Sequence, residues 1–283
     1  MNINKVSIIG AGTMGNGIAH VFALNGFSVD LIDVNDEILN KAKNKISNNL
    51  DRQVKKEIIT DSDKGNALNR IKLIIGIDNI DSKSDLVIEA IIENKSVKLE
   101  LWKKVNSIVD QNSIFASNTS AISITELSAD IRPDKFIGMH FMNPVPVMKL
   151  VEIIRGYSTS NETYNTIKEL SEALKKTPVE VHDYPGFISN RILMPMINEA
   201  VYTLYEGVAS AEDIDTVMKL GMAHPMGPLT LADFIGLDVC LDIMNVLYEG
   251  FNDSKYRPCP LLKKMVAAKK LGRKTKEGFF KYE

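Results

Sequence analysis

The segment from Lys5 to Gly17, KVSIIGAGTMGNG, constrains the fold of this chain more than any other. An apolar run at 6–9 is typical of a buried strand, and apolar residues at helical spacing follow at 18–23. Between the two lie three glycines spaced G-x-G-x-x-G: Gly10, Gly12 and Gly15. A glycine turn that joins a strand to a helix is the context in which this motif binds a dinucleotide. The unpaired N–H groups at the start of the helix then face the pyrophosphate.

The residues after this helix supply the second half of the motif. SVDLID at 28–33 predicts the next strand, and its last residue, Asp33, stands about 20 residues past the glycines. An acid at that place accepts hydrogen bonds from the adenosine ribose and repels a 2′-phosphate, which favours NAD(H) over NADP(H). The alternative for Asp33 is a loop or capping acid, with Asp36 the better candidate for the cap of the next helix. The predicted cofactor loop comprises Gly10, Gly12, Thr13, Met14, Gly15 and Asp33.

The composition excludes several classes of protein. The net charge of −2 gives no indication of a nucleic-acid or membrane-surface partner, and no run approaches the ~20 apolar residues of a membrane span. The chain enters a predicted strand at once, which leaves no room for a signal peptide. Cys240 and Cys259 are the only cysteines, so a disulfide scaffold is excluded, although one bond between them is not. We expect a cytoplasmic protein, and no cluster of Cys, His or Asp has the spacing of metal ligands.

Strand-like and helix-like segments alternate up to residue 182, which predicts an α/β domain with a mainly parallel sheet of the Rossmann type. We expect strands at 6–9, 28–33, 71–75, 85–90, 114–117, 135–141, 147–154 and 178–182. We expect helices at 37–52, 94–110 and 161–176, and a short helix or loop at 61–68. The first of these buries a face made of Ile38, Ala42, Ile46 and Leu50, and the second turns Lys98 mostly outward.

The turn cluster Asp183–Gly186 predicts a domain boundary, with a Rossmann domain at 1–184 and an all-helical domain at 185–283. Four helices are expected: one at 187–205, where Pro195 introduces a kink, one that opens at the capping box 210–213, one at 228–248 and one at 261–270. The first buries one side made of Ile188, Ile192, Met196, Ala200 and Leu204. An apolar helical unit of this kind is either a dimer interface or simply fills its own core.

A dehydrogenase moves a proton together with the hydride, and histidine is the side chain that titrates near neutrality. Of the four histidines, His140 lies near the end of a predicted strand, directly before the turn Asn143–Pro146. Glu152 follows twelve residues later on the returning strand, so a hairpin can bring imidazole and carboxylate together. Such a carboxylate orients the ring and raises its basicity. The alternative is that both are ordinary core or surface residues of a sheet.

Five long motifs give the chain a family resemblance over its whole length. They are ASNTS (116–120), GMHFMNPVPVMKLVEII (138–154), YPGFISNR (184–191), HPMGPLTLADFIGLD (224–238) and LGRKTKEGFFKY (271–282). With these motifs the chain resembles the L-3-hydroxyacyl-CoA dehydrogenases, and within that family the short bacterial form that acts on 3-hydroxybutyryl-CoA. Lys276 departs from the family pattern, in which a glycine commonly follows LGRKT.

The resemblance implies roles for the residues of these motifs. His140 is then the general base, Glu152 its carboxylate partner, and Ser117 the residue that bonds the C3 oxygen beside the nicotinamide. Asn190 bonds the substrate from the helical domain, in a cleft between the domains, and Asn143 holds the nicotinamide side. At the carboxyl edge of the sheet, where ligands of open α/β sheets bind, we add Ala90, Glu93 and Lys98 to the expected cofactor residues. The structural alternatives are a strand-end cap for Ser117, a helix cap for Asn190 and a turn residue for Asn143.

The resemblance also implies the reaction, the substrate and the assembly. We expect reversible NAD-dependent oxidation of a short-chain (S)-3-hydroxyacyl-CoA to the 3-oxoacyl-CoA, without a metal, by a homodimer. Lysines act as point charges for phosphates, so the exposed Lys55 and Lys56 are the candidates for the phosphate end of CoA. Two other functions stay open. One is a 3-hydroxy acid dehydrogenase that does not use CoA, although the lysine of that class is missing from FISNR. The other is a non-catalytic NAD-binding protein.

Overall fold

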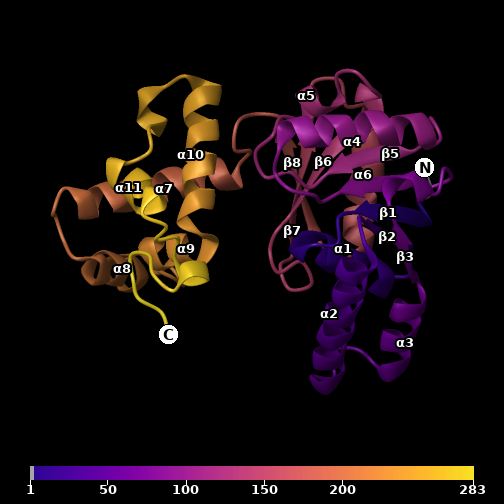
Figure 1. Ribbon diagram of the computed structural model, residues 1–283, viewed down its shortest axis with the longest axis horizontal. Coiled ribbons are helices and arrows are strands. Elements are labelled where there is room, and N and C mark those ends of the chain that lie inside the picture. Colours follow the sequence, from indigo (N-terminus) through magenta and orange to yellow (C-terminus); the bar gives the residue numbers. More distant parts are fainter. Residues whose placement is uncertain (1–2) are drawn as a thin grey trace. The chain divides into compact units, whose positions relative to one another are not determined.

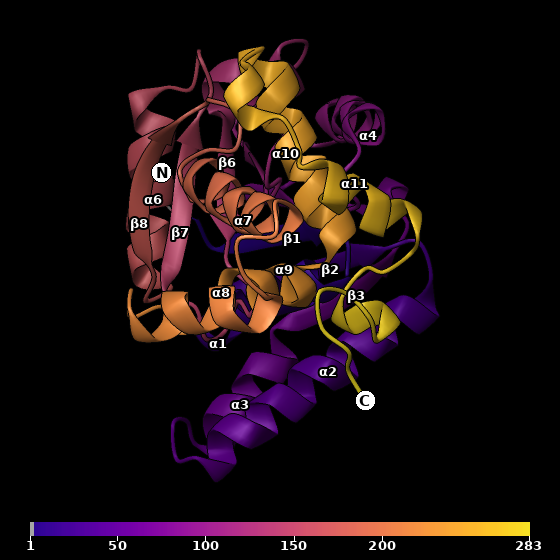
Figure 2. The same ribbon diagram turned by 90° about the vertical axis from the view of Figure 1, so that its left-hand side faces the viewer.

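A computed structural model describes residues 3–283, which divide into two compact units after Asp183 (Figures 1 and 2). The predicted domains, 1–184 and 185–283, meet one residue later. The first unit is an α/β domain of the Rossmann type and the second is helical, so the predicted fold class is confirmed.

The first unit is built on one eight-stranded sheet in the order β3-β2-β1-β4-β5-β6-β7-β8. All neighbouring pairs are parallel except β6 and β7, which are antiparallel. Each predicted strand is present within a few residues of its expected ends. The strands are β1 (Lys5–Ile9), β2 (Ser28–Asp33), β3 (Ile71–Ile75), β4 (Leu86–Glu89), β5 (Ile114–Ser117), β6 (Phe136–Phe141), β7 (Leu150–Arg155) and β8 (Thr177–His182).

Helices cover both faces of this sheet. They are α1 (Thr13–Leu24), α2 (Asp36–Lys55), α3 (Asp61–Asn69), α4 (Lys95–Ile108), α5 (Ile124–Ser128) and α6 (Asn161–Ala173). Side chains of α1, α2 and α6 share one apolar core with one face of the sheet. On the other face Trp102 of α4 stacks on Phe115 and meets the edge of Phe136, each with ring centroids 4.9 Å apart. Both views show α2 and α3 side by side, extending beyond the sheet (Figures 1 and 2).

The alternation of side chains along the strands decides which residues share the α4 face. Phe115 and Phe136 contact Trp102 there, so Ser117, two residues after Phe115, and His140, four residues after Phe136, point the same way. Glu152 is paired with His140 across β6 and β7 and lies on this face too. The candidate site residues therefore collect at the carboxyl end of the sheet, on the side of α4.

Two expected helix faces in the first unit need correction. Leu39 is fully buried in α2 with Ala42, Ile46 and Leu50, whereas Ile38 is 36% exposed and faces a pocket described below. The cap of this helix is Asn35, whose side chain accepts from Ile38 N at 3.0 Å, and not Asp36. Lys98, expected to face outward on α4, is only 1% exposed, because a buried carboxylate binds its ammonium group.

The second unit packs five helices around an apolar core. They are α7 (Ser189–Tyr205), α8 (Ala211–Leu220), α9 (Pro228–Ile235), α10 (Leu237–Phe251) and α11 (Pro260–Ala267). The single helix expected at 228–248 is two helices, since Gly236 has a φ of 107°, which no helix accommodates. In α7 the buried side includes Met194, Ile197 and Val201 together with the predicted Ala200, whereas Ile188 and Ile192 are 43% and 68% exposed, so the prediction was wrong for these two residues. Cys240 and Cys259 are buried free thiols.

No helix in residues 3–283 is both long and apolar enough to cross a membrane. No three His, Cys, Asp or Glu side chains of the described chain are grouped so that they would hold a metal ion.

Candidate active site

The glycine loop has the geometry of a dinucleotide cradle. Gly10 has a φ of 98°, and a Cβ there would lie 2.6 Å from Ala90 O. A Cβ on Gly15 would lie 1.7 Å from Gly10 O, so α1 can approach the loop closely only with glycine at this position. Gly12 instead borders open space, where a ligand can approach the backbone, and no side chain caps the start of α1. The first backbone N–H groups of α1 are therefore available to a phosphate.

A pocket of about 680 Å³ opens in front of this loop, at the carboxyl ends of β1, β2 and β4. Its lining includes Gly10, Gly12, Thr13, Met14, Asp33 and Ala90 of the predicted cofactor residues, together with apolar side chains such as Ile38, Val97 and Leu101. The Asp33 carboxylate accepts from Ala11 N at 2.6 Å and from Val34 N at 2.7 Å, which fixes it beside the loop. An apolar pocket with a phosphate cradle and an acid at its edge fits an adenine dinucleotide.

His140 and Glu152 form the pair that the sequence predicted. They are direct partners in the β6–β7 register, and His140 Nδ1 lies 2.7 Å from Glu152 Oε2. Both are buried, with exposed fractions of 7% and 2%. A carboxylate only accepts hydrogen bonds, so it requires the proton on Nδ1 and leaves the lone pair of neutral imidazole on Nε2. The ring is thereby prepared to receive a proton at Nε2.

The hydroxyl that meets this lone pair belongs to Ser120, a residue that the sequence reasoning missed. Ser120 Oγ lies 3.1 Å from His140 Nε2, and with the tautomer set by Glu152 the hydroxyl is the donor. Ser120 lies in the loop just past the end of β5. Loops at the carboxyl ends of parallel strands form the ligand sites of such sheets, and this is the signal that points to Ser120.

Ser117 does not occupy the position expected for a substrate contact. It is the last residue of β5, it is fully buried, and its hydroxyl donates to Glu89 Oε2 at 2.6 Å. Its oxygen also accepts from Thr119 N at 3.2 Å. Ser117 points to the same face of the sheet as His140, but its side chain is fully buried. Ser120, three residues later, is the serine whose hydroxyl lies at His140 Nε2.

The lining of the 680 Å³ pocket does not include Glu93 and Lys98, two of the expected cofactor residues. Lys98 Nζ binds Glu89 Oε1 and lies 3.3 Å from Glu93 Oε2. The other oxygen of Glu93 accepts from Thr119 Oγ1 at 2.5 Å, from Ser120 N at 2.8 Å and from Ala121 N at 3.2 Å. Glu93 thus holds the loop that carries Ser120.

The turn between β6 and β7 is fixed by a buried lysine. Lys176 Nζ donates to Val145 O at 2.5 Å and to Met148 O at 2.7 Å, and burial lowers the pKa of Lys176. Asn143, expected to hold the nicotinamide side, is exposed in this turn and precedes the cis peptide bond to Pro144. Asn190 is 8% exposed near the start of α7, in the second unit.

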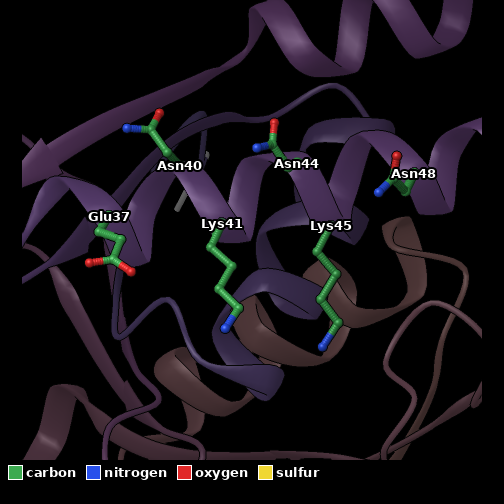
Figure 3. A pocket seen from close by; sticks show the side chains of 6 residues that line it. All are labelled: Glu37, Asn40, Lys41, Asn44, Lys45 and Asn48. Carbon is green, nitrogen blue, oxygen red and sulfur yellow. The ribbon is translucent and has the colours of Figure 1, made fainter.

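Basic side chains are exposed along α2 and directly after it. Lys55 ends the helix and Lys56 follows it, both open to solvent. Earlier in the helix Lys41 and Lys45 point to one side, and Asn40, Asn44 and Asn48 to the other (Figure 3). A hollow of about 660 Å³ runs along these residues. This helix therefore offers accessible ammonium groups along most of its length.

Comparisons with known proteins cover nearly the whole chain. Residues 5–184 match the model of the 3-hydroxyacyl-CoA dehydrogenase NAD-binding domain, and residues 186–282 match that of the 3-hydroxyacyl-CoA dehydrogenase C-terminal domain. The 3-hydroxybutyryl-CoA dehydrogenase of Bradyrhizobium diazoefficiens is 54% identical over 99% of this chain and 96% of its own. A probable 3-hydroxybutyryl-CoA dehydrogenase of Bacillus subtilis is 52% identical over 100% and 99%. The crystal structure of (S)-3-hydroxybutyryl-CoA dehydrogenase from Ralstonia eutropha is also 52% identical, with a TM-score of 0.97 and 100% of both chains covered.

Proposed function

Because this chain belongs to the 3-hydroxyacyl-CoA dehydrogenase family, we propose that it interconverts (S)-3-hydroxybutyryl-CoA and acetoacetyl-CoA with NAD as cofactor. It is an NAD-dependent oxidoreductase. The short-chain CoA substrate is supported by the two relatives and the solved structure named above, which are 52–54% identical. The observation that carries the chemistry is the His140 ring, whose Nε2 lone pair is set by Glu152 and already receives a hydroxyl hydrogen bond.

In the oxidation direction the 3-hydroxyl of the substrate takes the place of the Ser120 hydroxyl at His140 Nε2. The hydroxyl proton moves to Nε2 while the C3 hydrogen leaves as hydride with its electron pair, so that C3 becomes the carbonyl carbon. NAD⁺, when bound, supplies the acceptor of that hydride. Glu152 stabilises the imidazolium that forms, and this is the usual contribution of a carboxylate partner. In the reduction direction His140 returns the proton to the C3 oxygen.

Ser120 is the proposed hydrogen-bond partner of the C3 oxygen, in place of Ser117, because its hydroxyl is the one that lies at Nε2. We assign to Asn190 a second contact with the substrate and to Asn143 a contact on the nicotinamide side, both supported by the family motifs. Lys55 and Lys56 are the proposed contacts of the CoA phosphates, supported by their exposure and charge.

The preference for NAD(H) rests on Asp33, whose carboxylate is held at the edge of the pocket. A 2′-phosphate there would meet a fixed negative charge. We place the enzyme in the cytoplasm, in keeping with two buried cysteines that form no disulfide.

A homodimer is proposed from the second unit. It exposes several large apolar side chains, two of which, Val208 and Val217, line one pocket, and exposed apolar surface of this kind is typical of an interaction site. These side chains include Ile192 at 68%, Val208 at 70%, Val217 at 59% and Leu220 at 83%. Light scattering on the purified chain tests the dimer, and a monomer mass at micromolar concentration would remove this part of the proposal.

The experiment that tests the function is consumption of NADH, followed by its absorbance, with acetoacetyl-CoA, with free acetoacetate and with NADPH in place of NADH. Rapid turnover with acetoacetyl-CoA and NADH, and little with the other combinations, is expected. Turnover with free acetoacetate at a similar rate would favour a dehydrogenase that does not use CoA. NADH binding without turnover of any substrate would favour the non-catalytic alternative.

A further inference from the structure

We propose that Asn118 is a positioning residue, which joins the loop that carries Ser120 to the strand that carries His140 and so holds the Ser120 hydroxyl at the imidazole. The inference rests on the proposed role of Ser120. It gives the Asn118 side chain a task in the active site through its partner there, which is the backbone N–H of Phe141.

The first step is the place where the pairing of β5 and β6 ends. The two strands are parallel, and their last paired residues are Ser117 and Gly138. β5 ends at Ser117, whereas β6 continues to Phe141 and carries His140 in this extension. A link between this end of β6 and the β5 side therefore depends on the residues that follow Ser117.

The second step is the hydrogen bond that supplies the link. Asn118 Oδ1 accepts from Phe141 N at 3.0 Å. A backbone N–H only donates, so the amide must turn its oxygen toward Phe141. Both residues are buried, with exposed fractions of 8% and 2%, and a backbone N–H in such surroundings needs a partner. The Asn118 side chain thus continues the pairing past the end of β5.

The third step is that Asn118 is itself fixed. Its own N–H donates to Glu89 O at 2.8 Å, at the end of β4. β4 is the second parallel neighbour of β5 in the sheet. Asn118 therefore bonds to β4 through its backbone and to β6 through its side chain, and it fixes the start of the loop between these two strands.

The fourth step connects this bond to the catalytic contact. Ser120 follows Asn118 by two residues, and His140 directly precedes Phe141. The contact of 3.1 Å between Ser120 Oγ and His140 Nε2 thus joins the same two segments as the Asn118–Phe141 bond. Without Asn118 Oδ1 the two segments would lose this link, and the hydroxyl would meet Nε2 less often.

The test is a double-mutant cycle between Asn118→Ala and Ser120→Ala, measured as kcat at saturating acetoacetyl-CoA and NADH. If Asn118 acts through Ser120, Asn118→Ala lowers kcat about tenfold in the wild-type background and less than about twofold in the Ser120→Ala background. The Kd for NADH, measured by calorimetry, changes less than about threefold, since Asn118 does not line the dinucleotide pocket. Equal losses of kcat in both backgrounds, or a Kd for NADH that weakens in step with kcat, would overturn the proposal.

Two further variants keep the test informative if Asn118→Ala does not fold. Asn118→Asp retains an oxygen for Phe141 N, so its kcat should stay within about threefold of wild type. The kcat values are compared at the plateau of each pH profile, because a nearby charge can shift the titration of a histidine. Asn118→Ser keeps the position polar but is too short to reach Phe141 N, and it should lose kcat as Asn118→Ala does. A loss in Asn118→Asp as large as that in Asn118→Ser would contradict the proposal.

A matched control separates positioning from the mere satisfaction of a buried backbone group. Thr159 is buried, and its hydroxyl donates to Phe136 O at 2.7 Å, at the opposite end of the same strand β6. Thr159→Val removes this bond and should lower the thermal stability while kcat stays unchanged. If Thr159→Val and Asn118→Ala lower kcat by the same factor, the effect of Asn118 is only structural.

A readout that needs no substrate separates this inference from the proposed function. The chain has four histidines, so the imidazole ¹⁵N spectrum is small and His140 can be assigned with His140→Gln. The Nε2 resonance in Asn118→Ala should move toward its position in Ser120→Ala, because both variants weaken the same hydrogen bond. A resonance that stays at the wild-type position would contradict the positioning role, even if the enzyme acts on a different substrate.

Discussion

Glu152 Oε2 lies 2.7 Å from His140 Nδ1, and the two residues face each other directly in the antiparallel pair β6–β7. The contact is thus built into the register of the sheet, and neither side chain comes from a flexible loop. Because the sheet fixes both backbones, the orientation of the imidazole ring depends on the carboxylate more than on the approach of a ligand.

Replacement of Glu152 by Gln tests this dependence. The amide fills the same space but removes the charge that stabilises the imidazolium and sets the tautomer, so kcat should fall about 100-fold. The Kd for NADH should stay within about twofold, because Glu152 does not line the dinucleotide pocket. Stopped-flow kinetics and calorimetry check the two values. A kcat within threefold of wild type would show that the pair is only structural.

Ser120→Ala and Ser117→Ala should have different effects. Ser120→Ala removes the hydroxyl at Nε2 and should lower kcat/KM for acetoacetyl-CoA at least about tenfold, with little change in thermal stability. Ser117→Ala removes a donor to buried Glu89 and should lower the free energy of unfolding by about 1–3 kcal/mol. Steady-state kinetics and urea unfolding of both variants decide the assignment. The reverse pattern would restore Ser117 as the substrate contact.

Charge reversal at Lys55 and Lys56 tests the proposed CoA contacts. The double variant Lys55→Glu/Lys56→Glu should raise KM for acetoacetyl-CoA about tenfold and leave KM for NADH unchanged, because only the CoA substrate would meet these charges. The matched control is Lys263→Glu/Lys264→Glu, an exposed pair on α11 in the second unit. If both double variants have the same KM for acetoacetyl-CoA, the CoA phosphates bind elsewhere.

Burial lowers the pKa of His20 from its ordinary 6.5, so the folded chain binds fewer protons than the unfolded chain below that pH. The free energy of unfolding should therefore fall as the pH drops below 6.5, by at most about 1.4 kcal/mol per pH unit from this group. Urea unfolding between neutral and mildly acidic pH should show a shallower decline for His20→Gln than for wild type. Parallel curves would mean that His20 does not contribute to acid destabilisation.

The sequence was sufficient for features that follow from local spacing. The glycine loop, the position of Asp33 at the end of the second strand and the mainly parallel sheet follow from motif and periodicity. The His140–Glu152 contact could be predicted because a rigid turn and two strands of known direction fix the register. These features depend on residues close together in the chain, or on one hairpin.

The features that could not be predicted depend on long-range partners. Lys98 sits at a position of α4 that helical spacing alone assigns to the surface, and it is buried because Glu89, at the end of a separate strand, binds it. Ser117 and Ser120 belong to the same motif, and the motif does not indicate which of the two hydroxyls meets His140. In the structure the Ser117 hydroxyl donates to buried Glu89, whereas the Ser120 hydroxyl lies at His140 Nε2. Ile38 is exposed because the dinucleotide pocket, not the core, is its neighbour.

The most direct measurement is the rate of NADH consumption with acetoacetyl-CoA, for wild type and for His140→Gln, at saturating concentrations of both substrates. The account predicts rapid turnover by wild type and a kcat at least about 100-fold lower for His140→Gln, with the Kd for NADH unchanged. A His140→Gln enzyme that keeps near-normal turnover would contradict the assignment of His140 as the acid–base residue and with it the mechanism.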